Sequence, residues 1–360
     1  NGTAVHFQGF WFCYQYEHVC RKYSKEKFST ERRLQNFPMT PFSVIMKQAG
    51  AQSCKTASCR PGPVFSVAGF YEYSDMESKA QPMEPYEKIE QSILKKYRKQ
   101  IWYRFIGAMK DYRLVQAGDR IAVCISGGKD SMLLAKCLQL LQRHSEVPYE
   151  LEFLAMDPGY SAENRKLILS NAEKLNIPLN LFETRIFEIV AKSGGTPCYL
   201  CARMRRGYLY AYAKKLGCNK IALGHHFDDM IETALMSMLY AAEIRTMMPK
   251  LHSTHFPGME IIRPLYLVRE ADILAWKRYN NLQFLRCACL LTEKLETDSR
   301  VSKRAQTKKL IAALRRENPQ IDVNIFRSMH NVNLDTVIGY RQNGVKHSFL
   351  DRYDESGKKT

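Results

Sequence analysis

Short apolar runs alternate with helical segments through the middle of this chain, and this alternation is the strongest constraint on its fold. We predict buried strands at residues 120–125, 151–156, 179–183, 220–223 and 260–262. We predict helices at residues 132–141, from Ser161, at residues 203–216 and from Asp228. Buried strands that alternate with helices are typical of a parallel sheet covered on both faces. The prediction is therefore an α/β fold, a doubly wound and mainly parallel sheet with flanking helical segments, whose ligands bind at the carboxyl ends of the strands.

The remaining pattern divides the chain into five segments. Residues 1–84 mix aromatic residues, glycine, proline and cysteine without a sustained period, so we predict an extension that is disordered or atypical. Residues 85–117 form a helical lead-in, and residues 118–270 form the α/β domain. Residues 271–340 form a basic helical segment with late cysteines, and residues 341–360 are a tail.

Charge and cysteine content narrow the function. The 54 lysines and arginines exceed the 36 aspartates and glutamates, which gives a net charge of +18 and favours a polyanionic partner such as nucleic acid. The odd count of 11 cysteines argues against a disulfide framework and favours reduced thiols in the cytoplasm, with metal binding open to some of them. No apolar stretch approaches the ~18 residues of a membrane span, so we expect no membrane partner.

A Gly-rich turn joins the first predicted strand to the helix after it, with the sequence Ser126-Gly127-Gly128-Lys129-Asp130-Ser131. Paired glycines let the backbone approach a phosphate, and the start of a helix adds partial positive charge. The serine hydroxyls can donate hydrogen bonds, and the lysine can neutralise charge. Neither the Walker A spacing nor the Rossmann spacing is present. An ordinary strand-to-helix turn is the alternative, and the complete six-residue string in this context favours a phosphate loop.

Four cysteines are candidate metal ligands. Cys198 and Cys201 lie three residues apart, just before the helix predicted from Arg203, and Cys287 and Cys289 come later. The helix start and its arginines favour thiolates. A structural zinc could use all four cysteines, a redox pair needs the first two, and an iron–sulfur cluster held by three thiolates would keep one iron open. Spacing by itself favours zinc.

Taken in order, the motifs resemble those of the tRNA 2-thiocytidine synthetases (TtcA) and TtcA-like PP-loop ATPases. The string from Ser126 to Ser131 looks like the signature of PP-loop enzymes, which cleave ATP between the α and β phosphates. The other motifs that carry the resemblance lie at residues 197–207, 223–229, 248–251, 262–265, 287–289, 318–320 and 329–332. The resemblance covers roughly residues 85–340 and implies a HUP-like PP-loop domain.

The resemblance implies an ATP-dependent enzyme that activates C2 of an anticodon-loop cytidine in tRNA by adenylating its O2 oxygen, and then replaces that oxygen with sulfur. It implies a [4Fe–4S] cluster in place of zinc, with Cys198 and Cys201 as two of three ligands. The third is Cys289 or Cys287, with a slight preference for Cys289, because the family often has a late C-x-x-C pair where this chain has C-x-C. Sulfur would come from a cysteine desulfurase or another donor. A homodimer is compatible with these expectations.

Two other functions fit the motifs less well. One is a PP-loop enzyme of the lysidine-synthetase kind, which modifies a tRNA base without a cluster. The other is a zinc-stabilised tRNA-binding protein without catalysis, against which the intact phosphate loop argues. Iron content separates the first from the thiolating enzyme, whereas the second would bind tRNA and zinc but release no pyrophosphate.

Polar residues after two other strands complete the predicted ATP site. Gly224 and His225 follow the fourth strand, where ATP chemistry would occur, and Asp229 is a candidate Mg²⁺ ligand. Asp228 can instead cap the helix that follows. Asp157 ends the second strand and is a candidate contact for adenosine or substrate. The predicted catalytic residues are Lys129, Asp229, Cys198 and Cys201.

Two basic clusters are candidates for contact with tRNA. Residues 300–316 predict an amphipathic helix, and a second cluster at residues 95–99 stands beside Trp102 and Tyr103. Recognition of an anticodon loop needs phosphate contacts and stacked bases. A solvated charged face is the alternative for either cluster. The predicted tRNA contacts are Arg203, Arg205, Arg206, Lys303, Arg304, Lys308 and Lys309.

Overall fold

The computed structural model describes residues 83–192, 197–285 and 303–353, apart from the side chains of residues 197 and 198. Predictions for residues 1–82, for Cys287 and Cys289 and for the end of the tail lie outside the described residues. In the described part, none of the helices is long and apolar enough to cross a lipid bilayer.

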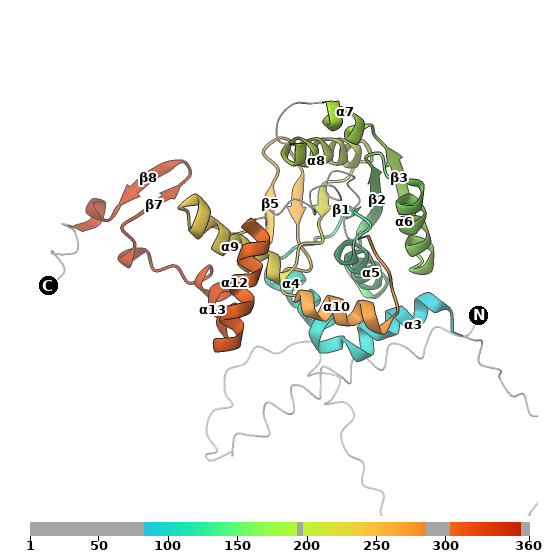
Figure 1. Cartoon of the computed structure of the whole chain (residues 1–360), viewed down its shortest axis with the longest axis horizontal. Helices are drawn as coiled ribbons and strands as arrows, with labels where there is room; N and C mark the ends of the chain where they lie inside the picture. Colours follow the sequence, from blue (N-terminus) through green and yellow to red (C-terminus); the bar gives the residue numbers. More distant parts are fainter. Residues whose placement is uncertain (1–82, 193–196, 286–302, 354–360) are drawn as a thin grey trace, which may run out of the picture. The chain divides into compact units, whose positions relative to one another are not determined.

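A six-stranded sheet forms the centre of the described domain (Figure 1). Its strands are β1 (Arg120–Ile125), β2 (Glu150–Asp157), β3 (Leu179–Glu183), β4 (Lys220–Ala222), β5 (Lys250–His252) and β6 (Glu260–Ile262). They lie in the order β3-β2-β1-β4-β6-β5, and every pair is parallel except β5 with β6. The predicted mainly parallel sheet is confirmed. The short edge strand β5 was not predicted, because its three residues are mostly exposed and form no apolar run.

The strand order reverses at β1. The chain passes from β1 outward to β2 and β3, and then returns to pair β4 with the other side of β1. In open parallel sheets, ligands bind outside the carboxyl ends of the strands at such a switch point. The loops that follow β1 and β4 are therefore the expected walls of a ligand site.

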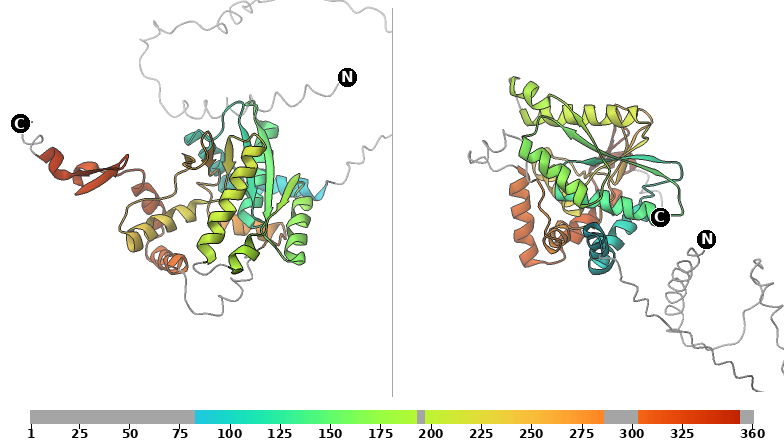
Figure 2. Two further views of the ribbon diagram at one scale, coloured as in Figure 1. Left: turned by 90° about the horizontal axis from the view of Figure 1, so that it is seen from above. Right: turned by 90° about the vertical axis from the view of Figure 1, so that its right-hand side faces the viewer.

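Helices cover both faces of the sheet (Figure 2). They are α5 (Lys129–His144), α6 (Ala162–Lys174), α7 (Ile186–Lys192), α8 (Pro197–Lys215), α9 (Phe227–Ala241) and α10 (Glu270–Tyr279). Ile121 and Val123 of β1 pack with residues of α5, α6 and α10 in the main core. Ala122 and Cys124 of the same strand face the opposite way and pack against α8. Because both faces of β1 are buried, its sequence is a continuous apolar run instead of an alternating one.

The helical lead-in is joined to α5 by a buried ion pair. It comprises α3 (Pro85–Gln91), two π-helical turns (Ser92–Lys96 and Arg98–Trp102) and α4 (Tyr103–Asp111). Lys136 on α5 is completely buried and donates hydrogen bonds to Glu90 of α3 at 2.5 Å and to the Leu175 carbonyl at 2.7 Å. Arg143 also reaches Glu90, at 2.6 Å. The helix that begins at the phosphate loop is thereby fixed against the rest of the core.

The last described segment is helical and then forms a hairpin. Its elements are α12 (Lys303–Glu317), α13 (Ile321–Ser328), two 3₁₀ turns (Leu334–Thr336 and Phe349–Arg352), β7 (Gly339–Gln342) and β8 (Val345–Ser348). The predicted amphipathic helix is confirmed within the described residues, since Ile311 of α12 is buried with Phe227 and Ile231 of α9. The hairpin was not predicted, although its Asn343-Gly344 turn, with positive φ at both residues, is a common hairpin signal.

Removing Glu90 should destabilise the protein through the charge left on Lys136. We expect Glu90→Ala to lower the free energy of unfolding by about 3 kcal/mol, because the ammonium would remain buried without its counter-charge. Urea unfolding of the two proteins measures the difference. The double variant Glu90→Leu/Lys136→Met removes both charges and should recover most of the loss. An equal loss in both variants would show that the unpaired charge is not the cause.

Candidate active site at the carboxyl ends of β1 and β4

Ser126 and Ser131 stabilise the turn after β1 through hydrogen bonds within it. Ser131 Oγ accepts a hydrogen bond from the Ser126 amide at 3.2 Å and donates one to the Gly128 carbonyl at 2.9 Å. Gly127 has a φ of 80°, and a Cβ there would lie 2.7 Å from Ile168 and 2.9 Å from Leu285. Glycine is therefore needed both for the left-handed backbone and for the space. The predicted strand–turn–helix geometry of the phosphate loop is present, with α5 beginning at Lys129.

The loop after β4 lies directly on the start of α5. A Cβ added to Gly224 would stand 3.0 Å from both the Asp130 carbonyl carbon and the Ser131 amide nitrogen. Real Cβ atoms rarely approach other atoms so closely, so only glycine permits this contact without a shift of the backbone. The contact brings His225 and Asp229 next to the phosphate loop.

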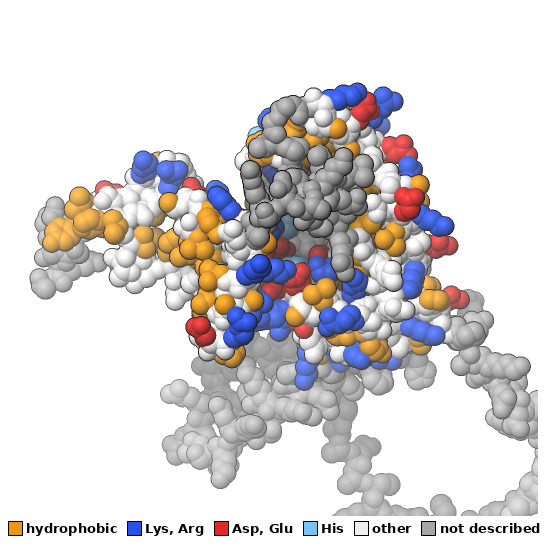
Figure 3. Space-filling model, in the orientation of Figure 1, with side chains coloured by type: hydrophobic (Ala, Val, Ile, Leu, Met, Phe, Trp, Pro, Cys, Tyr) orange, Lys and Arg blue, Asp and Glu red, His pale blue; other side chains and the backbone are white. Residues whose placement is uncertain are grey.

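A cavity of about 700 Å³ opens where the two loops meet. It brings together most of the predicted site residues, namely Ser126, Lys129, Asp130, Ser131, Arg205, Arg206, Gly224, His225, Asp229, Arg304 and Lys308. The lining does not include Asp157, Cys201, Arg203, Lys303 or Lys309, and Gly127 and Gly128 shape the turn without lining the cavity. Figure 3 shows basic and acidic side chains side by side over the region of α10 and α12.

Lys129 is held between two carboxylates. Its Nζ lies 3.0 Å from Asp130 Oδ2 and 3.3 Å from Glu270 Oε1. Burial lowers the pKa of Lys129, but the two carboxylates outweigh burial and place the pKa above its ordinary value. The side chain is therefore positively charged at neutral pH and lies where a phosphate would bind.

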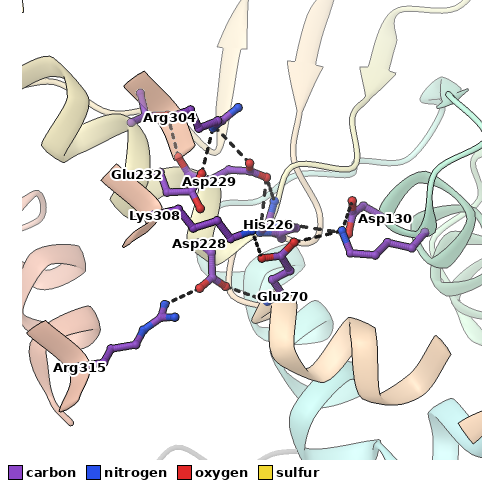
Figure 4. Close-up of polar contacts among 11 residues, drawn as sticks. Asp130, His226, Asp228, Asp229, Glu232, Glu270, Arg304, Lys308 and Arg315 are labelled. Atoms are coloured by element: carbon purple, nitrogen blue, oxygen red, sulfur yellow. Dashed lines mark hydrogen bonds and ion pairs between the residues drawn. The ribbon is translucent and has the colours of Figure 1, made fainter. Parts of the chain in front are cut away.

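Two acidic residues of the cavity were missed by the sequence analysis. Glu270, in the first turn of α10, lies 2.5 Å from Lys308 of α12 (Figure 4). Burial raises the pKa of Glu270, but the hydrogen bond from Lys308 and the charges of both lysines lower it to about 2. Glu232 pairs with Arg304 at 2.9 Å. Its position three residues after Asp229 on one helix was a usable signal, whereas no local pattern marked Glu270.

Asp228 and Asp229 are neighbours in the first turn of α9 but make different contacts. His226 is the N-cap residue of α9, and Asp229 completes a capping box with it, since Asp229 Oδ2 accepts a hydrogen bond from the His226 amide at 2.9 Å. Its Oδ1 lies 3.2 Å from Arg304. Asp228, the predicted cap, instead accepts hydrogen bonds from the Glu270 amide at 2.7 Å and from Arg315 at 2.6 Å. That alternative was wrong because the first turn of α9 directs Asp228 towards α10 and the C-terminal helices (Figure 4).

His225 is neutral in this environment. Burial is the largest cause that lowers its pKa, to about 4, and the charges of Arg263 and Arg304 add to it, while Asp229 opposes the shift. Its Nδ1 is buried and has no hydrogen-bond partner among the described residues. A neutral imidazole beside the phosphate loop can donate or accept a hydrogen bond with a ligand.

Asp157 is the buried last residue of β2, directly before a turn. Its Oδ1 accepts hydrogen bonds from the amides of Gly159 and Tyr160 at 2.8 and 2.7 Å, and its Oδ2 lies 3.4 Å from Arg165. These contacts shape the turn at the carboxyl end of β2. The expected contact of Asp157 with adenosine or substrate stays a prediction.

The cysteines at positions 198 and 201 lie inside a helix and not before one. Helix α8 begins at Pro197, a residue suited to a first helical position, so both cysteines belong to its first turns. Cys201 is half-buried in an apolar cluster with Met156 and Ile186. The side chain of Cys198 and the late cysteines lie outside the described part. Within that part, no group of three or more His, Cys, Asp or Glu side chains is arranged to hold a metal ion.

The phosphate loop at the switch point of a parallel sheet defines a nucleotide-binding α/β protein. This chain belongs to the PP-loop domain family, whose match covers residues 88–289. It is 36% identical over 228 residues to the tRNA-cytidine(32) 2-sulfurtransferase of Geobacter sulfurreducens, covering 62% of this chain and 86% of that protein. It is 33% identical over 241 residues to the tRNA-cytidine(32) 2-sulfurtransferase of Coxiella burnetii, covering 66% of this chain and 91% of that one.

A solved structure shares the fold. The U34-tRNA thiolase NcsA from Methanococcus maripaludis, described with its [4Fe-4S] cluster, superposes with a TM-score of 0.53 and 17% identity. The superposition covers 70% of this chain and 82% of NcsA. The PP-loop fold expected from the sequence is therefore confirmed by an independent structure.

Adding one methyl group at Gly224 should disrupt nucleotide binding. We expect Gly224→Ala to weaken ATP binding at least about tenfold, because the new Cβ would push the β4 loop away from the phosphate loop. Isothermal titration calorimetry measures the change. Gly207→Ala on α8 is the matched control, since a Cβ there meets nothing within 4 Å. Equal affinities for the two variants would show that the close contact is not required.

The depressed pKa of His225 predicts a loss of stability in acid. A histidine whose pKa is about 4 in the folded state and about 6.5 when unfolded binds more protons unfolded, so stability falls as the pH drops from 7 towards 4. From this group we expect a loss of about 2 kcal/mol between pH 7 and pH 5. Urea unfolding of the wild type and of His225→Asn at both pH values isolates the contribution of His225. The same pH dependence in the variant would contradict the assignment.

Proposed function

We propose that this protein is an ATP-dependent tRNA thiolase that converts cytidine 32 of tRNA into 2-thiocytidine. One observation carries the proposal. The phosphate loop and the segment from His225 to Asp229 meet in a single cavity, in a chain that spans 86% of a relative bearing that function in its name. Residues 118–270 hold ATP in this proposal, and residues 271–340 contribute to binding tRNA.

ATP binds with its phosphates on the loop from Ser126 to Ser131. The amides at the start of α5 and the ammonium of Lys129 face the negative charge. O2 of the cytidine attacks the α-phosphorus, the bond between that phosphorus and the β-bridging oxygen breaks, and pyrophosphate leaves. The adenylated base then reacts with a sulfur nucleophile at C2, and AMP leaves with the former O2. Lys129 offsets the charge that develops on the departing pyrophosphate.

Asp229 and Asp130 would hold Mg²⁺. The fit rests on the Oδ1 atom of Asp130, which is buried and has no hydrogen-bond partner among the described residues. A buried carboxylate oxygen without a donor suits a cation. Mg²⁺ binds phosphates together with one or two carboxylates, and it would supply charge neutralisation there.

Cys198, Cys201 and either Cys289 or Cys287 would hold a [4Fe–4S] cluster. Positions 198 and 201 lie about one turn apart near the start of α8, where the helix dipole favours thiolates, and apolar residues surround Cys201. A cluster held by three thiolates supplies an iron that can bind sulfur. A cysteine desulfurase or another donor provides that sulfur.

The tRNA would contact cations that lie outside the cavity or that are exposed along its lining. Arg203, Lys303 and Lys309 are exposed and line no part of the cavity, and Arg206 is exposed at its rim. Arg205 donates a hydrogen bond to the Tyr160 hydroxyl at 3.2 Å. In the second basic cluster, Lys96 lies 3.6 Å from the centre of the Tyr279 ring. We place the reaction in the cytoplasm, with no membrane partner. A homodimer is compatible with this function.

Two substitutions should separate adenylation from the cluster. We expect Lys129→Ala to reduce tRNA-dependent release of pyrophosphate about 100-fold while iron and acid-labile sulfide stay at wild-type levels. We expect Cys198→Ala to lose the cluster and 2-thiocytidine while ATP still binds. The assays are a pyrophosphate assay, iron and sulfide analysis of protein purified without oxygen, and mass spectrometry of tRNA nucleosides.

Cys218→Ala is the matched control, because Cys218 is buried in the apolar cluster on the α8 face of the sheet. It should keep its iron. Stoichiometric zinc without sulfide in the wild type, even after cluster reconstitution, would contradict the thiolation mechanism. Loss of the cluster from Lys129→Ala would contradict the separation of the two functions.

A further inference from the structure

A single carboxylate lies between a lysine of the phosphate loop and a lysine of the C-terminal helix. Glu270 Oε1 lies 3.3 Å from Lys129, and its Oε2 lies 2.5 Å from Lys308 on α12 (Figure 4). The Glu270 side chain is 18% exposed, whereas that of Lys308 is 55% exposed. Glu270 therefore occupies a position between two cations at which a phosphate could receive the same contacts.

Helix α12 presents a second cation to the same cavity. Arg304 lies one turn before Lys308, so the two side chains share a face of the helix. Both line the cavity, together with Ala305 between them. Arg304 lies 3.2 Å from Asp229 and 2.9 Å from Glu232. Burial raises the pKa of Glu232, and the charge of Arg304 opposes that shift.

The charged residues that line the cavity suit a site in which a bound phosphate replaces a carboxylate as the partner of a cation. Its lining cations are Lys129, Arg205, Arg206, Arg304 and Lys308, and its lining acids are Asp130, Asp229, Glu232 and Glu270. A polyphosphate carries several negative charges and three acceptor oxygens on its last phosphate, so it competes with carboxylates for the same donors. If Arg304 and Lys308 served only to attach α12 to the rest of the protein, they would not need to line the nucleotide cavity.

We propose that Lys308 and Arg304 of α12 bind the polyphosphate end of ATP and the pyrophosphate that leaves, and that Glu270 occupies this anion site until the nucleotide binds. The inference rests on the proposed function only in taking ATP as the substrate. It moves Arg304 and Lys308 from the set of expected tRNA contacts to the ATP site. Lys303 and Lys309 of the same helix stay with the tRNA.

Binding of inorganic pyrophosphate, ATP and AMP to the full chain tests the inference by calorimetry. We expect Lys308→Met to bind pyrophosphate and ATP about tenfold more weakly and AMP equally well, because one charge-assisted contact to the distal phosphates is lost. Lys309→Met is the matched control, because the adjacent Lys309 lines no part of the cavity. It should bind pyrophosphate as the wild type does.

The variant Glu270→Gln tests whether the Glu270 carboxylate competes with phosphate for the two lysines or only holds Lys308 in place. Removing the charge that competes for both lysines should tighten pyrophosphate binding about fivefold. If Glu270 only held Lys308 in place, the affinity would fall, and that result would overturn the inference. Equal pyrophosphate affinities for the wild type and Lys308→Met would also overturn it while leaving the proposed function standing. A wild type that binds neither ATP nor pyrophosphate would overturn both.

Discussion

The close contact between Gly224 and the start of α5 is the constraint on which the site depends. Because β1 and β4 are parallel neighbours, the loops that follow them leave the sheet at the same edge. The absence of a side chain at Gly224 lets the second loop rest on the backbone of Asp130 and Ser131. Gly127 performs a similar task on the other side, where Ile168 and Leu285 approach the turn. The missing side chains of Gly127 and Gly224 thus let neighbouring segments pack closely on both sides of the phosphate loop. His225 and Asp229 line the cavity because the two loops touch.

Ion pairs then connect this site to helices that are distant in the sequence. Asp228 joins the start of α9 to the amide of Glu270 and to Arg315. Glu270 joins α10 to the phosphate loop and to α12. The same charged side chains both fix α12 and line the cavity, so the docking of this helix and the binding of an anion are coupled through shared contacts.

Helix α8 links the nucleotide cavity to the cysteines. Its residues Arg205, Arg206, Leu209 and Tyr210 line the cavity. Position 201 lies eight residues before Leu209, which is about 12 Å along a helix axis. One rigid element therefore carries both the wall of the ATP site and two of the proposed cluster ligands. This arrangement would let an adenylated base and a sulfur donor meet without a large rearrangement of the fold.

The sequence by itself determined the parallel sheet, the phosphate loop and the amphipathic helix that carries Arg304 and Lys308. These features depend on local patterns, such as the continuous apolar run of a strand buried on both faces or a pair of glycines before a helix. Tertiary structure alone decided that Glu270 lines the cavity, that Asp228 pairs with Arg315 instead of capping α9, and which cations of α12 line that cavity. Those outcomes depend on ion pairs between residues far apart in the sequence, such as Lys129 with Glu270 and Arg315 with Asp228. No local pattern encodes which distant charges will meet once the core has packed.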